Sequence, residues 1–283
     1  MAKEKKQKRK FRLWQKIVLI IAALMLVTGI GFLAFPSVSN FFGQQRANKI
    51  IETFNNSLNN VVSTDGTASP AGIKSKTHAE AVEKGEIDSE GYAIDSNGNR
   101  TSDSPVVFEY DLDALYRDSV AYNKGLLNHQ GTVETTNYAK AALDMRSYGL
   151  SNFYCYLSIP AIDLYLPVYL GANDDMMSCG AAHLSGTSLP IDMKDTNVAI
   201  AGHTDYIGRI FFDNIRRLEK GNRVIVHNYW ETVEYKVIDK KTVAPTDTSD
   251  IYIRPGRQLM TLITCTPGEN GFDRYLVICE KAD

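Results

Sequence analysis

The sequence predicts a mostly β domain, a barrel or sandwich of largely antiparallel strands, behind a helical region and one N-terminal membrane-spanning helix. Three observations predict this arrangement. An uncharged run of nineteen residues, 17–35, follows a basic N-terminus; residues 106–150 carry apolar side chains at helical spacing; and short apolar runs rich in β-branched and aromatic residues begin at residue 153. With 283 residues, 44% hydrophobic and 23% charged, the chain is neither wholly disordered nor a small disulfide-stapled scaffold.

The N-terminus has the charge and length of a membrane anchor. Residues 1–16 hold eight Lys or Arg and one Glu, although the whole chain has a formal net charge of -2. The uncharged run 17–35 ends at Pro36 and would span roughly 28 Å as a helix, which matches a bilayer hydrocarbon core. A cleaved signal peptide would have a shorter apolar core and a small-residue cleavage site. The positive-inside rule therefore predicts a single-pass protein of the cell membrane, with residues 1–16 cytoplasmic and the chain beyond residue 42 outside.

The basic cluster could also be read as a nucleic-acid-binding patch. A cluster beside a spanning segment is already explained as a topogenic signal, so we expect no nucleic-acid partner.

Residues 36–105 are expected to form a stalk followed by a polar tether. Apolar side chains recur three and four apart in 44–62, which favours a helix there. From 63 to 105 there is no Phe, Leu, Trp, Met or Cys, and small polar residues dominate. This stretch is expected to bury too little apolar area to offset its ordering entropy.

The next region, 106–150, is expected to form a helical preface, with one apolar series through 112–126 and another through 138–145. The strands then follow in seven runs: Phe153–Ile159, Leu164–Leu170, Asn197–Ala201, Arg223–His227, Thr232–Val243, Leu259–Cys265 and Tyr275–Glu280. Apolar spacing predicts one helix among them, Arg209–Lys220, which Gly221 is placed to end.

The four cysteines allow three pairings into two disulfides, and their spacing does not choose among them. They are Cys155, Cys179, Cys265 and Cys279. No CxxC pair and no His/Cys cluster has the spacing of zinc ligands, so neither a metal nor another cofactor is expected. Three of the four lie in or beside apolar stretches and are expected to be small buried residues.

Cys265 differs from a buried structural cysteine because other potentially reactive residues are expected near it. It ends the apolar run 259–265, so a rigid strand would hold it at a loop opening. A second run, 197–201, leads to His203. Arg274 follows Cys265 by nine residues, and antiparallel pairing of the two runs would bring both to the same end of the sheet.

A thiol, an imidazole and a guanidinium at one sheet edge suit acyl transfer. A thiolate at Cys265 can attack an amide carbonyl, and a neighbouring cation favours its deprotonated form. His203 can protonate the departing amine. Arg274 carries a fixed charge and a fork of donors suited to the oxygen of a tetrahedral intermediate or to a substrate backbone.

These residues also carry a family resemblance. Thr261-Leu-Ile-Thr-Cys265, followed by Arg274 and preceded by Gly202-His203, resembles the TLxTC…R signature of sortases, the cysteine transpeptidases of Gram-positive cell envelopes. Further stretches resemble sortases in the same order, so that the likeness covers roughly 150–281: 166–171, 180–190, 212–221 and 243–247. The resemblance implies a closed eight-stranded β-barrel at 151–283. It also implies cleavage of an LPXTG-like sorting signal through a thioacyl-enzyme, with transfer to an amine.

The same resemblance implies a role for each site residue. Cys265 is the expected nucleophile, His203 the acid, and Arg274 the group that holds the oxyanion or orients the substrate. Thr264 is expected beside the nucleophile as a secondary contact. Asp205 could tune the charge of His203, the alternative being a solvated turn carboxylate.

The partners implied are secreted proteins with a C-terminal sorting signal and an amine acceptor, from a peptidoglycan precursor or a pilin lysine. Residues 180–190 and 265–267 are most like the pilin-polymerising class. No proline follows an aspartate, as it does in the lid of many members of that class, and no C-terminal membrane helix is seen, so a wall-anchoring class is the alternative. A disulfide between Cys265 and Cys279 would consume the nucleophile and is not expected.

Two other readings compete. In a papain-like hydrolase the Cys precedes the His along the chain, whereas His203 precedes Cys265 here. The non-enzymatic reading is a membrane-tethered β-barrel that binds peptides in a groove or along a strand edge, with an inert Cys265. His183 is expected to be structural in either case.

Overall fold

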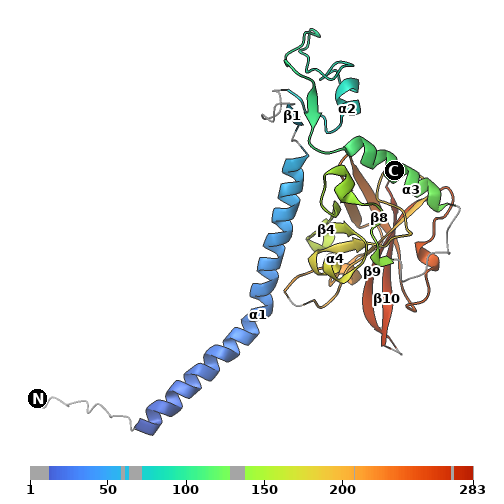
Figure 1. Cartoon of the computed structure of the whole chain (residues 1–283). Coiled ribbons are helices and arrows are strands. Elements are labelled where there is room, and N and C mark those ends of the chain that lie inside the picture. The colour runs from blue at the N-terminus through green and yellow to red at the C-terminus, as the bar shows by residue number, and fades with distance from the viewer. Residues whose placement is uncertain are drawn as a thin grey trace, which may run out of the picture.

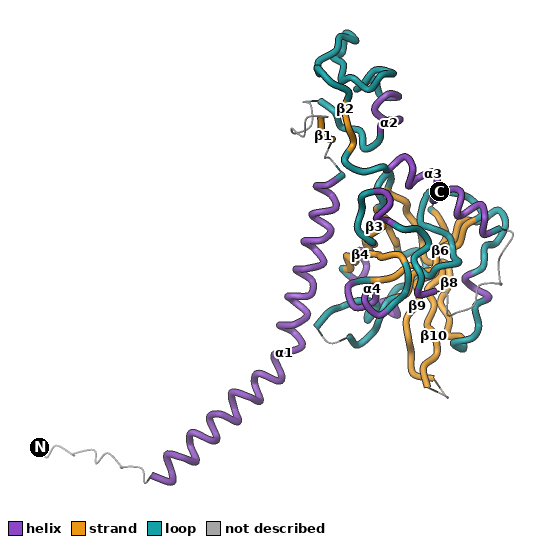
Figure 2. The backbone as a smooth tube through the Cα atoms, viewed as in Figure 1, coloured by secondary structure: helices purple, strands orange, loops and turns teal. Residues whose placement is uncertain are grey.

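The computed structural model describes residues 13–58, 61–63, 72–127, 138–206, 208–268 and 271–282. A long N-terminal helix runs beside a β-barrel, and a small module lies beyond the far end of this helix (Figures 1 and 2). Most of the basic segment 1–16 lies outside the described residues. The barrel carries the site, and the other parts matter here for how they contact it.

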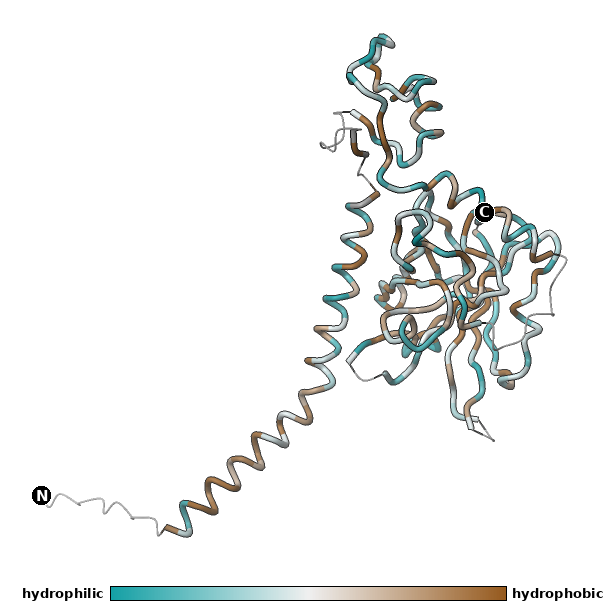
Figure 3. Tube along the Cα trace, viewed as in Figure 1, coloured by the Kyte–Doolittle hydropathy of each residue, from teal (hydrophilic) through white to brown (hydrophobic). Residues whose placement is uncertain are grey.

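The predicted anchor lies within α1 (Leu13–Ser57), a single helix of 45 residues. It is the one helix among the described residues that is long and apolar enough to cross a membrane. Figure 3 shows that its hydrophobic residues are concentrated in the half nearer the N-terminus. The large apolar side chains of this half are exposed. Pro36 does not end the helix, contrary to the expected boundary. A proline removes one backbone donor and bends a helix, and α1 is bent in Figure 1.

The second half of α1 packs against the barrel. Phe54 is only 4% exposed, and its ring lies edge-on to Phe153 and Tyr229, with centroids 4.7 Å apart in each case. Edge-to-face aromatic pairs of this kind stabilise a contact beyond the area they bury. The helix expected at 44–62 is therefore the docked continuation of the anchor.

The stretch expected to be a polar tether differs from expectation, because most of it is folded. Strand β1 (Val61–Ser63) pairs antiparallel with β2 (Val106–Phe108), and the short helix α2 (His78–Glu83) lies between them in sequence. A small apolar core fills the module: Ala81, Ile87, Ala93 and Val106, with Ile73 and Phe108 against it.

Turn chemistry accounts for this fold in so polar a sequence. The Asp88 carboxylate accepts backbone N–H groups from residues 90 and 92, and that of Asp95 accepts those of 97 and 99. The glycines that follow, Gly91 and Gly98, adopt the left-handed backbone that such turns require, with φ of 88° and 81°. Local hydrogen bonds thus replace much of the apolar burial that the composition lacks.

One half of the helical preface is as predicted. Helix α3 (Leu112–Leu126) begins at Asp111, whose carboxylate accepts the Ala114 N–H at 3.0 Å, and it buries its apolar face on the barrel. The second half is not an α-helix. Residues 128–137 lie outside the described residues. Residues 138–150 contain 3-10 geometry at 138–139 and the 3-10 turn η2 (Met145–Tyr148), but no α-helix.

Eight strands close into a barrel in the order β10-β8-β7-β3-β4-β5-β6-β9. Their bounds are β3 (Phe153–Ile159), β4 (Leu164–Leu170), β5 (Ala181–His183), β6 (Thr196–Ala201), β7 (Arg223–His227), β8 (Thr232–Val243), β9 (Gln258–Gly268) and β10 (Gly271–Lys281). All seven predicted strands are present, and the closed eight-stranded barrel implied by the resemblance is confirmed. Only three-residue β5 had no apolar run long enough to predict it. Two pairs are parallel, β4 with β5 and β6 with β9.

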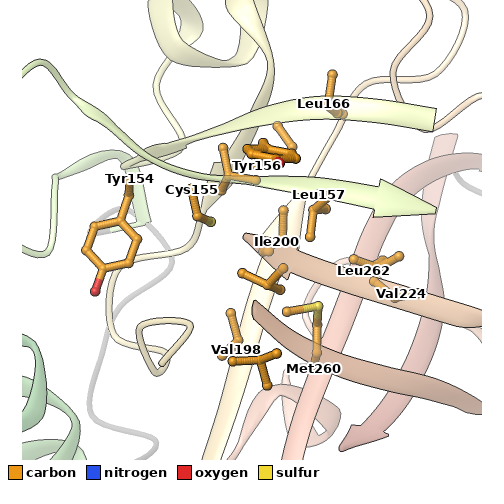
Figure 4. Packing of buried hydrophobic residues seen from close by; sticks show 14 of the residues in the cluster. Tyr154, Cys155, Tyr156, Leu157, Leu166, Val198, Ile200, Val224, Met260 and Leu262 are labelled. Atoms are coloured by element: carbon orange, nitrogen blue, oxygen red, sulfur yellow. The ribbon is translucent and has the colours of Figure 1, made fainter. Parts of the chain in front are cut away.

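Alternation along the strands separates the barrel interior from an outer row. Val198, Ile200, Met260 and Leu262 point into the core, where Figure 4 shows them packed together. Residues that alternate with the inward-pointing ones face the other side of the sheet, where Ala199, Ile263 and Leu276 belong to a separate apolar cluster. This outer row leads toward the site.

The prediction of a helix at Arg209–Lys220 is wrong. Only the 3-10 turn η4 (Ile215–Arg217) forms there. The Asp213 carboxylate accepts the backbone N–H groups of Asp205 and Phe211, both at 2.8 Å, which holds a turn in place of a helix. Ile210 is exposed, but the other apolar residues of this segment are buried, so their spacing reflects core contacts made without a helix: Phe211, Phe212, Ile215 and Leu218.

Candidate active site

The register of β9 and β10 places Cys265 and Arg274 opposite each other. They are Cα partners in this antiparallel pair, so their side chains lie on one face of the sheet, with Cβ atoms roughly 5 Å apart. β9 does not end at Cys265 as expected but continues to Gly268. Pro267 is tolerated within it because the pairing of β9 with β6 ends at Ile263, which leaves that strand edge free.

The parallel pairing of β6 with β9 brings His203 to the same place. Ala201 is the partner of Ile263, so His203 and Cys265 both lie two residues further along adjacent chains. Two bonds extend the pairing beyond the strand. The Gly202 N–H donates to the Ile263 carbonyl at 3.0 Å, and the Thr264 hydroxyl donates to the Gly202 carbonyl at 2.8 Å.

Thr264 is buried next to Cys265, and its hydroxyl ties the chain before His203 to β9. All three predicted chemical groups stand on neighbouring chain segments.

The side chains of this edge belong to the outer row. Ile263 and Leu276 are Cα partners on the outer face, and Cys265 and Arg274 are the next pair in that row. A groove of about 420 Å³ runs along it. Its lining includes Tyr138, Leu184, Ala201, Ile251, Ile263, Arg274 and Leu276. An apolar groove with a guanidinium at its edge thus leads to the position of Cys265.

Aromatic rings hold the His203 side chain. The Tyr206 ring is stacked on the imidazole, with centroids 5.2 Å apart and planes 19° apart, and Phe211 lies at 6.3 Å. The His203 carbonyl accepts the Phe212 N–H at 2.9 Å. Asp205 adopts a left-handed backbone, with φ of 57°, and its N–H bonds Asp213, which makes it a residue of the turn.

Gly202 permits the backbone before His203 to lie against the Phe212 ring. A Cβ at this position would meet ring carbons at 2.7 Å. We expect Gly202→Ala to displace either the ring or the His203 backbone. If His203 has the role expected from the sequence, kcat/KM for the expected peptide cleavage should fall by roughly 10- to 100-fold, because small misplacements of catalytic groups are costly. Gly125→Ala, in α3 with open space around its Cβ, is the matched control and should keep wild-type activity. Equal activity of both variants would show that the close approach is not needed.

Two guanidinium groups flank Cys265. Arg274 Nη1 donates to the carbonyls of Phe272 and Asp273 at 3.1 and 3.4 Å. Arg216, which the sequence reasoning missed, donates from Nη2 to the Cys265 carbonyl at 3.3 Å and lies over the Tyr275 ring. The signal for Arg216 was its place within 212–221, one of the family-like stretches.

All four cysteines are free thiols. Cys155 and Cys279 are buried in the barrel, and burial raises the pKa of each thiol well above its ordinary value. Cys179 is only partly buried, unlike the other two. Cys279 pairs in register with Met260, five residues from Cys265 along the strand. No group of three potential metal ligands occurs among the described residues.

His183 is a structural histidine. It is fully buried in β5, and its Nε2 lies 3.1 and 3.0 Å from the Thr187 and Ser188 carbonyls, so Nε2 carries the proton and donates it. Nδ1 is buried without a hydrogen bond among the described residues. Burial lowers the pKa of His183 from 6.5 to about 4.

This pKa predicts a pH-dependent loss of stability. Between about pH 6.5 and pH 4, His183 is protonated in the unfolded chain and neutral in the folded chain. The free energy of unfolding therefore falls as the pH falls, and this one group contributes about 3 kcal/mol of that loss. We expect His183→Gln to remove that part of the pH dependence. Urea unfolding of both proteins at about pH 7 and pH 4 checks this, and equal losses in the two would show that His183 does not titrate in this window.

Comparison with known proteins agrees with this geometry. Residues 157–282 match the family model of the sortase domain. Sortase A of Bacillus anthracis is 30% identical over 121 residues, which cover 43% of this chain and 56% of that one. The chain spans about half the length of the curated relatives that it matches.

Solved structures extend the likeness beyond the barrel. Sortase C-1 of Streptococcus pneumoniae superposes with a TM-score of 0.54 at 32% identity, covering 61% of this chain and 90% of that one. The pilus-related sortase C of Group B Streptococcus gives 0.53 at 30% identity, covering 61% and 89%. The chain belongs to the sortase family.

Proposed function

We propose that this protein is a membrane-anchored cysteine transpeptidase. It cleaves an LPXTG-like sorting signal and transfers the new acyl end to an amine. The observation that supports this most directly is the strand register, which sets Cys265 opposite Arg274 and beside His203.

The reaction follows from these positions. The Cys265 thiolate adds to the scissile carbonyl, and Arg274 donates hydrogen bonds to the oxygen that becomes negative. The C–N bond then breaks as His203 protonates the departing amine, which leaves a thioester on Cys265. An incoming amine attacks the thioester and loses a proton to His203, and the C–S bond breaks, which restores the Cys265 thiolate and the protonated His203. Water in place of the amine gives hydrolysis.

The groove along the outer row is the proposed peptide site. Its apolar lining suits the aliphatic residues of a sorting signal, and Arg274 lies where the peptide backbone would pass the nucleophile. Thr264 acts as a supporting residue because its hydroxyl fixes the strand end that carries His203. Asp205 contributes as a residue of the turn after His203, through its backbone bond to Asp213.

The membrane arrangement completes the proposal. Residues 1–16 are cytoplasmic, 17–35 cross the membrane, and the barrel at 151–283 lies outside, where secreted substrates emerge. Of the two parts between them, 36–105 includes the half of α1 that packs on the barrel, and 106–150 includes α3.

The acceptor is a pilin lysine or the amine of a peptidoglycan precursor. Likeness to sortase C structures over more than the barrel supports the pilin lysine. The curated relatives include sortases A and D, which are not of the C class, so the amine of a peptidoglycan precursor stays the alternative acceptor.

The experiment that tests the function uses the full chain in detergent. It is offered sorting-signal peptides with either a lysine-containing peptide or a cross-bridge peptide as the amine, and the products are identified by mass. We expect cleavage, a covalent acyl adduct on Cys265 and a new amide to one acceptor. Peptide binding without cleavage, together with a Cys265 that alkylates no faster than the buried cysteines, would instead support the non-catalytic peptide-binding barrel.

A further inference from the structure

The turn after His203 touches the anchor helix. Gly208, in this turn, has a left-handed backbone with φ of 91°, and a Cβ placed on it would meet the Ser39 hydroxyl of α1 at 2.5 Å. A Cβ placed on Gly43, one helical turn further along α1, would overlap the Gly208 carbonyl oxygen and lie 2.8 Å from Cγ of Arg209. The two backbones therefore meet where both residues are glycine.

This contact continues the docked face of α1. Ser39, Gly43 and Ala47 are spaced by four residues, so they lie in one row on the helix. All three are at least partly buried, although Phe41, on the opposite side of the helix, is exposed. Further along the same side the helix buries Phe54 against the barrel. Small residues let two backbones approach closely, and here the Gly208 turn packs against this row of small residues.

The turn is also held from its other side. Arg209 Nη1 donates to the Ser178 carbonyl at 2.7 Å, at the end of α4 (Asp174–Cys179). The turn thus lies between α1 and α4. Two residues before Gly208, the Tyr206 ring is stacked on the His203 imidazole.

We propose that α1 is a positioning element of the active site: its Ser39–Gly43 surface fixes the Gly208 turn and, through Tyr206, the orientation of the His203 ring. Ser39, Gly43, Gly208 and Tyr206 are positioning residues, since they act through His203. This proposal rests on the proposed role of His203. It implies that a soluble fragment without α1 lacks part of what holds its catalytic histidine.

The test uses full-length protein in detergent micelles or lipid nanodiscs. Gly43→Ala and Ser39→Leu place extra atoms against the turn. Gly31→Ala, where a Cβ meets open space, and Val38→Leu, at an exposed neighbouring position, are their matched controls. We expect Gly43→Ala and Ser39→Leu, the two seam variants, to lower kcat about 10-fold with KM changed less than about 2-fold. They should also speed amide hydrogen exchange of residues 203–206 and 208–212. The controls should change neither quantity.

Tyr206 supplies an independent arm. Tyr206→Ala should lower kcat to a similar extent, and Tyr206→Phe, which keeps the stacked ring, should restore it. If the Gly43 contact acts through Tyr206, the losses from Gly43→Ala and Tyr206→Ala will be less than additive in the double variant. A thermal unfolding midpoint near that of the wild type separates these effects from loss of the fold.

Wild-type kcat and wild-type exchange in Gly43→Ala would overturn the proposal, as would full additivity with Tyr206→Ala. Failure of the proposed function looks different. The wild-type protein would then cleave no peptide at all, and the exchange of the His203 turn in the seam variants would still decide whether α1 fixes it.

Discussion

Cys265→Ala is expected to abolish peptide cleavage and acyl transfer, with a loss of at least about 10³-fold, because no thioester can form without the sulfur. The barrel should persist. Cys265 is half-buried in β9, three residues before that strand ends, so removing the thiol leaves no deep cavity and should change the free energy of unfolding by less than about 1 kcal/mol. Mass spectrometry should find the acyl adduct in the wild type and none in the variant.

Cys179→Ala is the matched control, because Cys179 is also a partly buried free thiol but lies in α4. It should leave turnover unchanged. Undiminished cleavage by Cys265→Ala would remove the nucleophile from the mechanism and with it the proposed function.

The strands were predictable because burial on one or both faces forces apolar, β-branched sequences of strand length. β3, β4, β7 and β8 have the predicted bounds to the residue. β5 was missed because three residues carry too little pattern to separate them from a loop. Closure of the barrel came from the family resemblance, since local periodicity does not distinguish a barrel from a sandwich.

Two of the errors share one physical cause, which is local hydrogen bonding that neither apolar spacing nor composition reports. The Asp213 carboxylate stabilises a turn in a segment whose apolar residues have helical spacing. Asp88 and Asp95 order turns in a segment that composition assigns to a tether. In both cases short polar side chains satisfy the backbone in place of a helix or of solvent.

The residues of the candidate site that lie at the ends of predicted strands could be predicted from the sequence. Cys265, His203 and Arg274 were found because each lies at or near the end of an apolar run, and pairing of those runs brings them together. Contacts that depend on tertiary approach were not predictable. The distance in sequence between Gly43 and Gly208 leaves no local pattern to relate them, and Arg216 reaches the Cys265 carbonyl from a loop.

Arg274→Lys is expected to lower kcat/KM about 100-fold although the positive charge is kept. Among the described residues, Arg274 Nη1 makes both bonds to the Phe272 and Asp273 carbonyls, which leaves the Nη2 and Nε donors of the fork for the substrate. An ammonium group has no such fork and cannot hold these carbonyls and the substrate in one fixed plane. Arg223→Lys, which alters an exposed pair with Glu234 on β7 and β8, is the control and should keep full activity.

The steady-state constants for Arg274→Lys distinguish the two roles proposed for the guanidinium. An oxyanion contact is made only in the transition state, so its loss lowers kcat and leaves KM nearly unchanged. A contact that holds the substrate backbone is already made in the bound peptide, so its loss raises KM. Turnover of Arg274→Lys close to that of the wild type would mean that only a positive charge is required at this position. The register of β9 with β10 would then matter because it places that charge beside Cys265, and the geometry of the guanidinium donors would not matter.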